Sequence, residues 1–114
     1  MAPMTSPEPR QGEALDEIIH NPTRLRICAA LSSATALEFA VLEEGLGIST
    51  SLLSKQLKTL VDAGYVTLER RRQPVGRPRT WVAITPSGRH AVQDHVAALH
   101  ALIDQPLAES DPGT

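Results

Sequence analysis

The chain has 114 residues and a formal net charge of −2, with 41% hydrophobic and 3% aromatic residues. This length fits one domain, and the single cysteine, Cys28, excludes an internal disulfide and a cysteine-based zinc site. No run approaches the roughly 18 apolar residues of a membrane span and no signal peptide is evident, so we expect a cytoplasmic protein.

Charge is distributed unevenly along the chain. Residues 49–90 contain eight basic and two acidic residues, whereas the rest of the chain contains three basic and eleven acidic ones. The overall negative charge argues weakly against binding to nucleic acid. A basic segment on an acidic protein is nevertheless typical of a surface that binds a polyanion.

The two ends of the chain are polar and contain several prolines. They predict disordered tails over residues 1–12 and 104–114. One folded domain is therefore expected over residues 13–103.

Two helices are predicted at the start of this domain. The first runs from Glu13 to His20, and its apolar face comprises Leu15, Ile18 and Ile19. Asn21 and Pro22 are typical of an N-cap and a first helical residue. The second helix is predicted to end near Leu31, and its expected buried residues are Leu25, Cys28, Ala29 and Leu31.

A third helix is predicted from Ala36 to Glu44, with Thr35 as its N-cap. Residues 45–48 then predict a tight turn, because two glycines in three residues suit a positive φ and close packing.

The helix predicted over residues 51–63, capped by Ser49 or Thr50, is the most informative element. Its core-facing stripe comprises Leu53, Leu57, Leu60 and Val61. Its outward positions comprise Ser51, Lys55, Lys58 and Asp62, with Ser54 and Thr59 at the edges. Hydroxyls and lysines that follow a tight turn are typical of a helix that reads the major groove. The alternative is the solvated face of an ordinary amphipathic helix.

Two alternating segments, residues 65–69 and 80–84, predict a β-hairpin with a long polar loop. Its five arginines are Arg70, Arg71, Arg72, Arg77 and Arg79. Crowded like charges favour a polyanionic partner, and a narrow minor groove suits arginine side chains. The alternative is a charged loop that serves solubility.

The last helix is predicted over residues 87–103, after Thr85 and Pro86. Its 4-3-4 stripe comprises Val92, Val96, Leu99 and Ile103. Together with Leu15, Ile18 and Ile19 this stripe is expected to form the interface of a homodimer, unless it packs only on its own domain. Protonation of His95 or His100, which flank the stripe, is expected to weaken that dimer in mild acid.

No metal site and no cofactor are expected. His90, His95 and His100 are five residues apart, so helical rotation keeps them from converging on one ion. Cys28 is expected to be a small buried hydrophobe, with a redox switch as the alternative.

Three runs together resemble the winged-helix regulators of the MarR and ArsR type. Residues 46–66 look like their helix-turn-helix, residues 77–89 like their wing, second strand and last-helix start, and residues 21–27 like their first helix. The resemblance covers about residues 15–103. It implies a winged helix-turn-helix with N- and C-terminal dimerisation helices, mainly α with a small β-hairpin (α+β). It also implies a homodimeric transcription factor, usually a repressor.

We therefore predict a sequence-specific regulator of double-stranded DNA that binds a palindromic operator. Nothing resembles a catalytic site, so no enzyme is expected. The predicted DNA contacts are Ser49, Thr50, Ser51, Ser54, Lys55, Lys58, Arg70, Arg71, Arg72, Arg77 and Arg79. A small-molecule effector, if one exists, would bind between the DNA-binding core and the dimer helices. The alternative function is a protein–protein interaction module whose basic wing docks an acidic partner.

Overall fold

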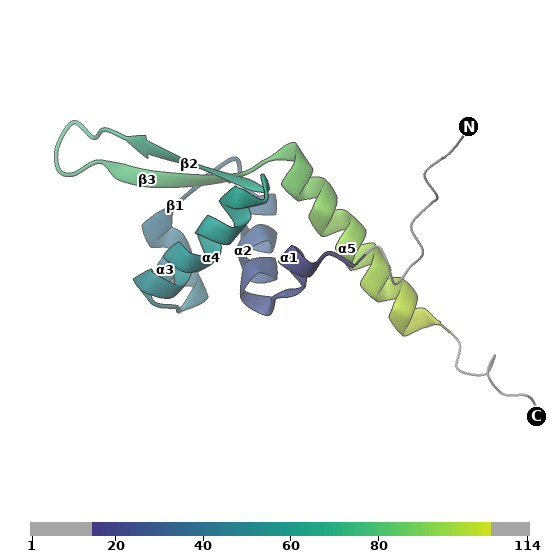
Figure 1. The fold of residues 1–114 in the computed structure, drawn as a ribbon. Coiled ribbons are helices and arrows are strands. Elements are labelled where there is room, and N and C mark those ends of the chain that lie inside the picture. Colours follow the sequence, from purple (N-terminus) through teal and green to yellow (C-terminus); the bar gives the residue numbers. More distant parts are fainter. Residues whose placement is uncertain (1–14, 106–114) are drawn as a thin grey trace, which may run out of the picture.

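The computed structural model describes residues 15–105, which form a helical body with a small antiparallel sheet (Figure 1). Within this range the elements are α1 (Glu17–His20), α2 (Pro22–Ser32), β1 (Leu37–Glu38), α3 (Phe39–Leu46), α4 (Thr50–Asp62), β2 (Val66–Arg71), β3 (Arg79–Ile84) and α5 (Pro86–Asp104). The hairpin of β2 and β3 extends from one side of the body, and the C-terminal end of α5 extends from the other (Figure 1). The predicted fold class, mainly α with a small β-hairpin, is confirmed.

Four helices begin at a side-chain cap, and the capping residues are Asp16 (α1), Asn21 (α2), Ser49 (α4) and Thr85 (α5). In each case a side-chain oxygen accepts a hydrogen bond from a backbone amide in the first turn. Ser49, rather than Thr50, is therefore the cap of α4. The predicted start of the first helix at Glu13, and most of the two predicted tails, lie outside the described residues.

The segment after α2 differs from the prediction. Thr35 does not cap a helix, because residues 37 and 38 form strand β1, which pairs antiparallel with β3 (Leu37 with Val82, Glu38 with Trp81). Helix α3 begins only at Phe39 and has no side-chain cap. Here the backbone N–H and C=O groups form hydrogen bonds with a strand more than forty positions away. The local helical pattern carries no information about that contact.

The sheet has the order β1-β3-β2, so β3 is its central strand. The register of the hairpin runs from Val66 opposite Ile84 to Arg71 opposite Arg79. Residues directly opposite each other share a face, so this register decides which arginines point toward the helices.

The core consists of aliphatic side chains from the helices and the sheet, together with one cysteine, namely Ile19, Ile27, Cys28, Leu31, Leu42, Leu53, Leu57, Leu60, Val66, Val82 and Ile84. Two predicted helix faces are corrected. On α2, Ile27 is buried and Ala29 is exposed, because Ala29 lies about 200° around the helix from Ile27. On α4, Gln56 is buried whereas Val61 is 37% exposed.

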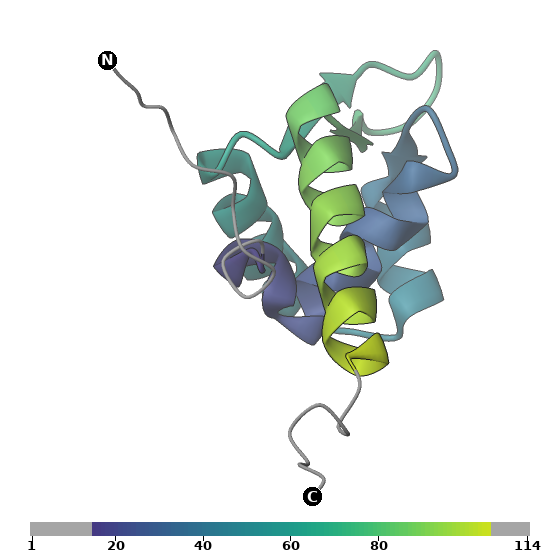
Figure 2. The same ribbon diagram turned by 90° about the vertical axis from the view of Figure 1, so that its right-hand side faces the viewer.

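Helix α5 packs on α1, α2 and β3. Its buried residues are Gly88, His95 and Ala98, and its C-terminal end passes beyond the other helices (Figures 1 and 2). Among residues 15–105, no helix combines the length and apolar character needed to cross a membrane.

Candidate nucleic-acid interface

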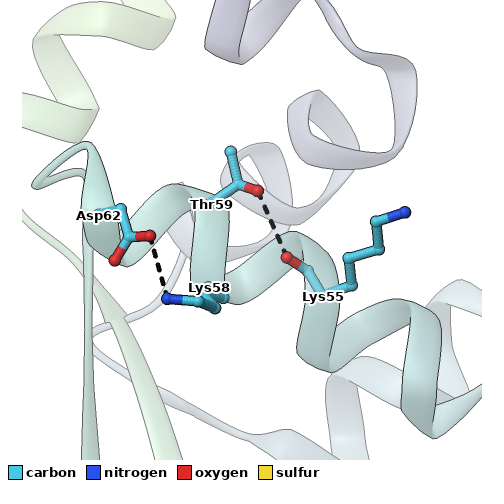
Figure 3. A network of polar contacts seen from close by, with 4 residues as sticks. All are labelled: Lys55, Lys58, Thr59 and Asp62. Atoms are coloured by element: carbon cyan, nitrogen blue, oxygen red, sulfur yellow. Dashed lines mark hydrogen bonds and ion pairs between the residues drawn. The ribbon is translucent and has the colours of Figure 1, made fainter.

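The outer face of α4 carries the residues that were predicted to read DNA. Ser51, Ser54, Lys55 and Lys58 are all exposed. The Lys55 side chain extends away from the helix, while its backbone carbonyl accepts a hydrogen bond from Thr59 at 3.4 Å (Figure 3). The N-terminal half of α4 therefore presents hydroxyl groups and one extended cation to solvent.

Lys58 is partly neutralised by its own helix. Its ammonium group lies 3.2 Å from the Asp62 carboxylate one turn later, and the two side chains are 76% and 63% exposed (Figure 3). Such exposed pairs contribute only about 0.3–0.5 kcal/mol. Lys58 can therefore exchange Asp62 for a phosphate at little cost.

Two of the other predicted contacts have structural partners. The hydroxyl oxygen of Ser49 accepts from the Leu52 amide, and the Thr50 hydroxyl donates to the Glu43 carboxylate. These bonds fix the turn between α3 and α4, so both residues help to position α4 whether or not they also touch a ligand.

Beneath its outer face, α4 is held by a polar contact that was not predicted from the sequence. Arg24 of α2 donates from Nη1 to Gln56 Oε1 at 2.6 Å and from Nε to the Ile18 carbonyl at 2.6 Å. Gln56 is only 8% exposed. The spacing gave no signal for it, because positions 53, 56, 57 and 60 and positions 53, 57, 60 and 61 both span about 100° of the helix circumference.

The hairpin separates its arginines onto two faces. Arg71 and Arg79 lie opposite each other on the face that carries Trp81, whose ring the Arg71 guanidinium covers at 4.7 Å from the centroid. Arg71 also bonds Glu69 at 3.1 Å, and Arg79 bonds Glu38 of β1 at 3.0 Å. Both arginines are therefore engaged within the protein.

Arg70 lies on the other face, opposite Thr80 and next to Leu68 on that side of the strand. This face turns toward α4, because Leu68 and Thr80 line a cavity together with residues of that helix. Arg72 and Arg77 lie in the loop between the strands. Within residues 15–105, these three arginines pair with no described carboxylate, so they remain available to a ligand.

The cavity between α4 and the hairpin has a volume of about 370 Å³. Its lining comprises Phe39, Ser54, Leu57, Lys58, Val61, Asp62, Leu68 and Thr80. Half of these residues are apolar and half are polar, and the cavity lies beside the exposed face of α4 rather than between the core and α5.

A sequence model of the winged helix DNA-binding domain matches residues 23–103, most of the chain. The chain belongs to this family. In this winged helix domain the wing is the hairpin of β2 and β3, and α4 occupies the place of the recognition helix.

Solved structures of transcriptional regulators have the same fold. A transcriptional regulator homologue from Pyrococcus horikoshii OT3 is 28% identical, with a TM-score of 0.72 over 78% of this chain and 87% of that one. YusO from Bacillus subtilis is 17% identical, with a TM-score of 0.68 over 89% and 70%. A mutant MarR from E. coli, complexed with operator DNA, is 18% identical, with a TM-score of 0.60 over 82% and 64%. Among curated protein sequences, none matches the chain significantly.

The predicted dimer residues of this winged helix domain are not equally accessible. Ile19 is fully buried in the core of a single chain, which removes it from the expected interface. Leu15, Ile18, Val92 and Leu99 are half-buried, whereas Val96 and Ile103 are exposed. Leu102, which the 4-3-4 stripe did not include, is also exposed.

The three histidines of α5 have separate environments. His90 and His100 are exposed, and His95 is fully buried against α1. His95 therefore does not flank a surface stripe as predicted, because α1 covers it. The expected effect of His100 on a dimer stays a prediction. Within residues 15–105, no group of three or more His, Cys, Asp or Glu side chains could hold a metal ion.

Cys28, on the inner face of α2, is fully buried. Burial, with a smaller contribution from the negative charge of Asp16, raises the pKa of the Cys28 thiol to about 11. At neutral pH the group is an uncharged thiol, as expected for a small buried hydrophobe and unlike a reactive cysteine.

Proposed function

We propose that the protein is a sequence-specific regulator of transcription that binds double-stranded DNA as a homodimer and acts as a repressor. The observation that carries the proposal is the pairing of two exposed basic elements. The outer face of α4 and the α4-facing side of the wing lie side by side in a winged helix domain. The fold shared with an E. coli MarR mutant bound to operator DNA supports the same function.

In the proposed complex α4 enters the major groove and the wing follows the adjacent minor groove. Ser51, Ser54 and Lys55 then face base edges and phosphates. Arg77 lies between Gly76 and Pro78 in the exposed loop, from which its guanidinium would enter a narrow minor groove.

A second copy of the chain would supply the other half of the interface. The exposed apolar residues of α5, namely Val96, Leu102 and Ile103, support a dimer that forms through this helix. Two-fold symmetry would set the two recognition helices about 34 Å apart, which matches a palindromic operator. A protein that acts on DNA in this way would work in the cytoplasm of a bacterial-type cell.

The experiment is fluorescence anisotropy with a duplex from the region upstream of the protein's own gene, compared with a scrambled duplex. If Lys55, Lys58, Arg70, Arg72 and Arg77 all contact phosphates, the slope of log K against log salt is about −4.5 per protomer. Tight, salt-dependent preference for the native duplex is the expected result. Equal, weak binding to both duplexes would favour the alternative, a module whose basic wing docks an acidic protein partner.

Two substitutions on α4 are expected to act in opposite directions. Lys55→Ala removes the extended cation and is expected to lower affinity for the preferred duplex about tenfold. Asp62→Asn releases Lys58 from its ion pair and is expected to raise affinity. Asp94→Asn on α5 makes the same charge change away from α4 and is the control. If all three variants bind like the wild type, α4 does not contact DNA.

A further inference from the structure

A partly buried polar cluster joins the N-terminal helix to α5, and the regulatory function above makes no use of it. We call it the His95 cluster; it comprises Asp16, His20, Tyr65 and His95. These residues come from three separate places: the cap and end of α1, the turn after α4, and the middle of α5. His95 is fully buried, so a polar ring lies inside an otherwise apolar contact.

The hydrogen bonds of His95 define where its proton lies. The backbone N–H of Asp16 donates to Nδ1 of His95 at 3.1 Å, so Nδ1 must be unprotonated. The single ring proton is therefore on Nε2, which faces Nδ1 of His20 at 3.4 Å. The two rings meet edge to face, with centroids 5.3 Å apart. This arrangement accepts only the neutral form of His95.

Asp16 binds the other parts of the cluster. One carboxylate oxygen accepts from the amides of Ile18 and Ile19 at 2.7 and 3.1 Å, and the other accepts from the Tyr65 hydroxyl. The hydrogen bond to Asp16 is the main cause that raises the pKa of Tyr65 to about 12, so the hydroxyl stays a donor at neutral pH. The position of α1 thus depends on Asp16, and Asp16 depends on an unprotonated His95.

We propose that the His95 cluster is a pH-sensitive latch, in which protonation of His95 in mild acid releases α1 from α5. A proton on Nδ1 would place two N–H donors against each other, and the hydrogen bond from Asp16 would be lost. The resulting imidazolium would also be a buried cation beside the His20 ring.

Some ionisable groups around His95 lower its pKa and others raise it. Burial is the largest cause that lowers the pKa of His95 below its ordinary value of 6.5, and His20 of α1 lowers it further. The Asp16 carboxylate opposes both. Tyr65, and Cys28 and Arg24 of α2, act on the Asp16 side of the cluster. The net direction favours the neutral ring while the latch is closed.

The sign of the pH dependence follows from this lowered pKa. The open state takes up a proton on His95 at a higher pH than the closed state does. The stabilisation is therefore complete above about pH 6.5 and is lost as the pH falls through the lowered pKa. Each unit of lowering corresponds to about a tenfold change in the equilibrium constant for opening.

The first test is an NMR titration of the free protein from pH 7.5 to 4.5, which follows the His95 ring and the amides of Asp16, Ile18 and Ile19. The expected result is that the three amides lose their closed-state shifts in step with protonation of His95. The proposal is overturned if His95 becomes protonated while these amides keep their shifts.

The second test compares variants by urea unfolding across the same pH range. In His95→Gln the amide oxygen can still accept from Asp16 but does not titrate, so its stability is expected to depend much less on pH than that of the wild type. His90→Gln, an exposed position on the same helix, is the matched control and is expected to follow the wild type. Equal pH dependence of His95→Gln and wild type would contradict the latch. Both tests omit DNA, so their outcomes do not depend on whether the protein binds DNA.

Discussion

Individual residues set how closely the elements of this domain approach each other. Gly88, in the first turn of α5, is the tightest such position: a Cβ atom there would lie 2.3 Å from the Tyr65 carbonyl oxygen and 2.8 Å from an Ile84 side-chain carbon. The same region is tied by the Thr85 amide, which donates to the Tyr65 carbonyl at 2.9 Å. Only glycine lets the start of α5 lie directly on the turn after α4.

Gly88→Ala is therefore expected to destabilise the protein by about 1–3 kcal/mol, because backbone rather than a flexible side chain must move. Urea denaturation measures the change. Gly45→Ala in α3 is the control: nothing lies within 4 Å of its added Cβ, and it is expected to stabilise by about 0.5–1 kcal/mol. Equal stability of the two variants would show that the close contact at Gly88 is not rigid.

Arg24 of α2 is a second residue that sets how elements approach each other, because its one side chain links α2 to both α1 and α4. It bonds α1 through the Ile18 carbonyl and the inner face of α4 through Gln56. Arg89 has a related role at the C-terminal end of α2, where it donates to the Ser32 carbonyl at 2.9 Å. Both are basic residues whose charge is used inside the protein, so a count of basic residues overstates the charge that is free for DNA.

At the scale of elements, the wing is a two-faced ribbon. On the face with Trp81, both arginines form ion pairs within the protein, Arg71 with Glu69 and Arg79 with Glu38. The face with Arg70 turns toward α4. Because neighbouring residues in a strand point to opposite faces, Arg70 and Arg71 differ in direction although they are adjacent in sequence.

This difference gives a matched pair of substitutions. Arg70→Ala is expected to lower DNA affinity about tenfold and to reduce the salt slope by about one, because a phosphate contact is lost. Arg71→Ala removes the same charge from the other face, where Trp81 and Glu69 hold it, and is expected to have a smaller effect. Anisotropy titrations at several salt concentrations measure both. A larger loss in Arg71→Ala would assign the opposite face of the wing to DNA.

At the scale of the whole molecule, the C-terminal end of α5 is a surface that no other element within residues 15–105 covers. Ile103 is 75% exposed and follows Leu102 on the part of α5 that passes beyond the body (Figure 1). Apolar groups in such a position are typical of a dimer helix. Their accessibility also means that a polar substitution there does not disturb the core.

Ile103→Asp is therefore expected to shift the protein from dimer to monomer without unfolding it. Analytical ultracentrifugation measures the change in mass, and circular dichroism checks the fold. Val75→Asp, at the exposed tip of the wing, introduces the same group at an equally accessible apolar residue and is expected to leave the dimer intact. A wild type that is monomeric at all concentrations would contradict the predicted homodimer.

Local sequence signals predicted most of the elements, because those signals act over a few residues. Asn21 and Thr85 were recognisable at the starts of their helices, and residues 65–69 and 80–84 as alternating strands. The exposed positions of Ser51, Ser54, Lys55 and Lys58 also followed from helical periodicity alone. Hydrogen bonds within one turn, and the period of a helix or strand, are properties of the local chain.

Contacts between distant residues were decided only by the tertiary structure. Strand β1 exists because β3 lies beside it, Gln56 is buried because Arg24 reaches it, and His95 is buried because α1 covers it. Likewise, only the strand register of the wing shows that Arg70 lies on a different face from Arg71 and Arg79. Local sequence patterns were therefore enough to predict most of the helices, the hairpin and the basic segment. The tertiary structure decided which charges face outward and which polar groups are enclosed, because burial depends on neighbours that are remote along the chain.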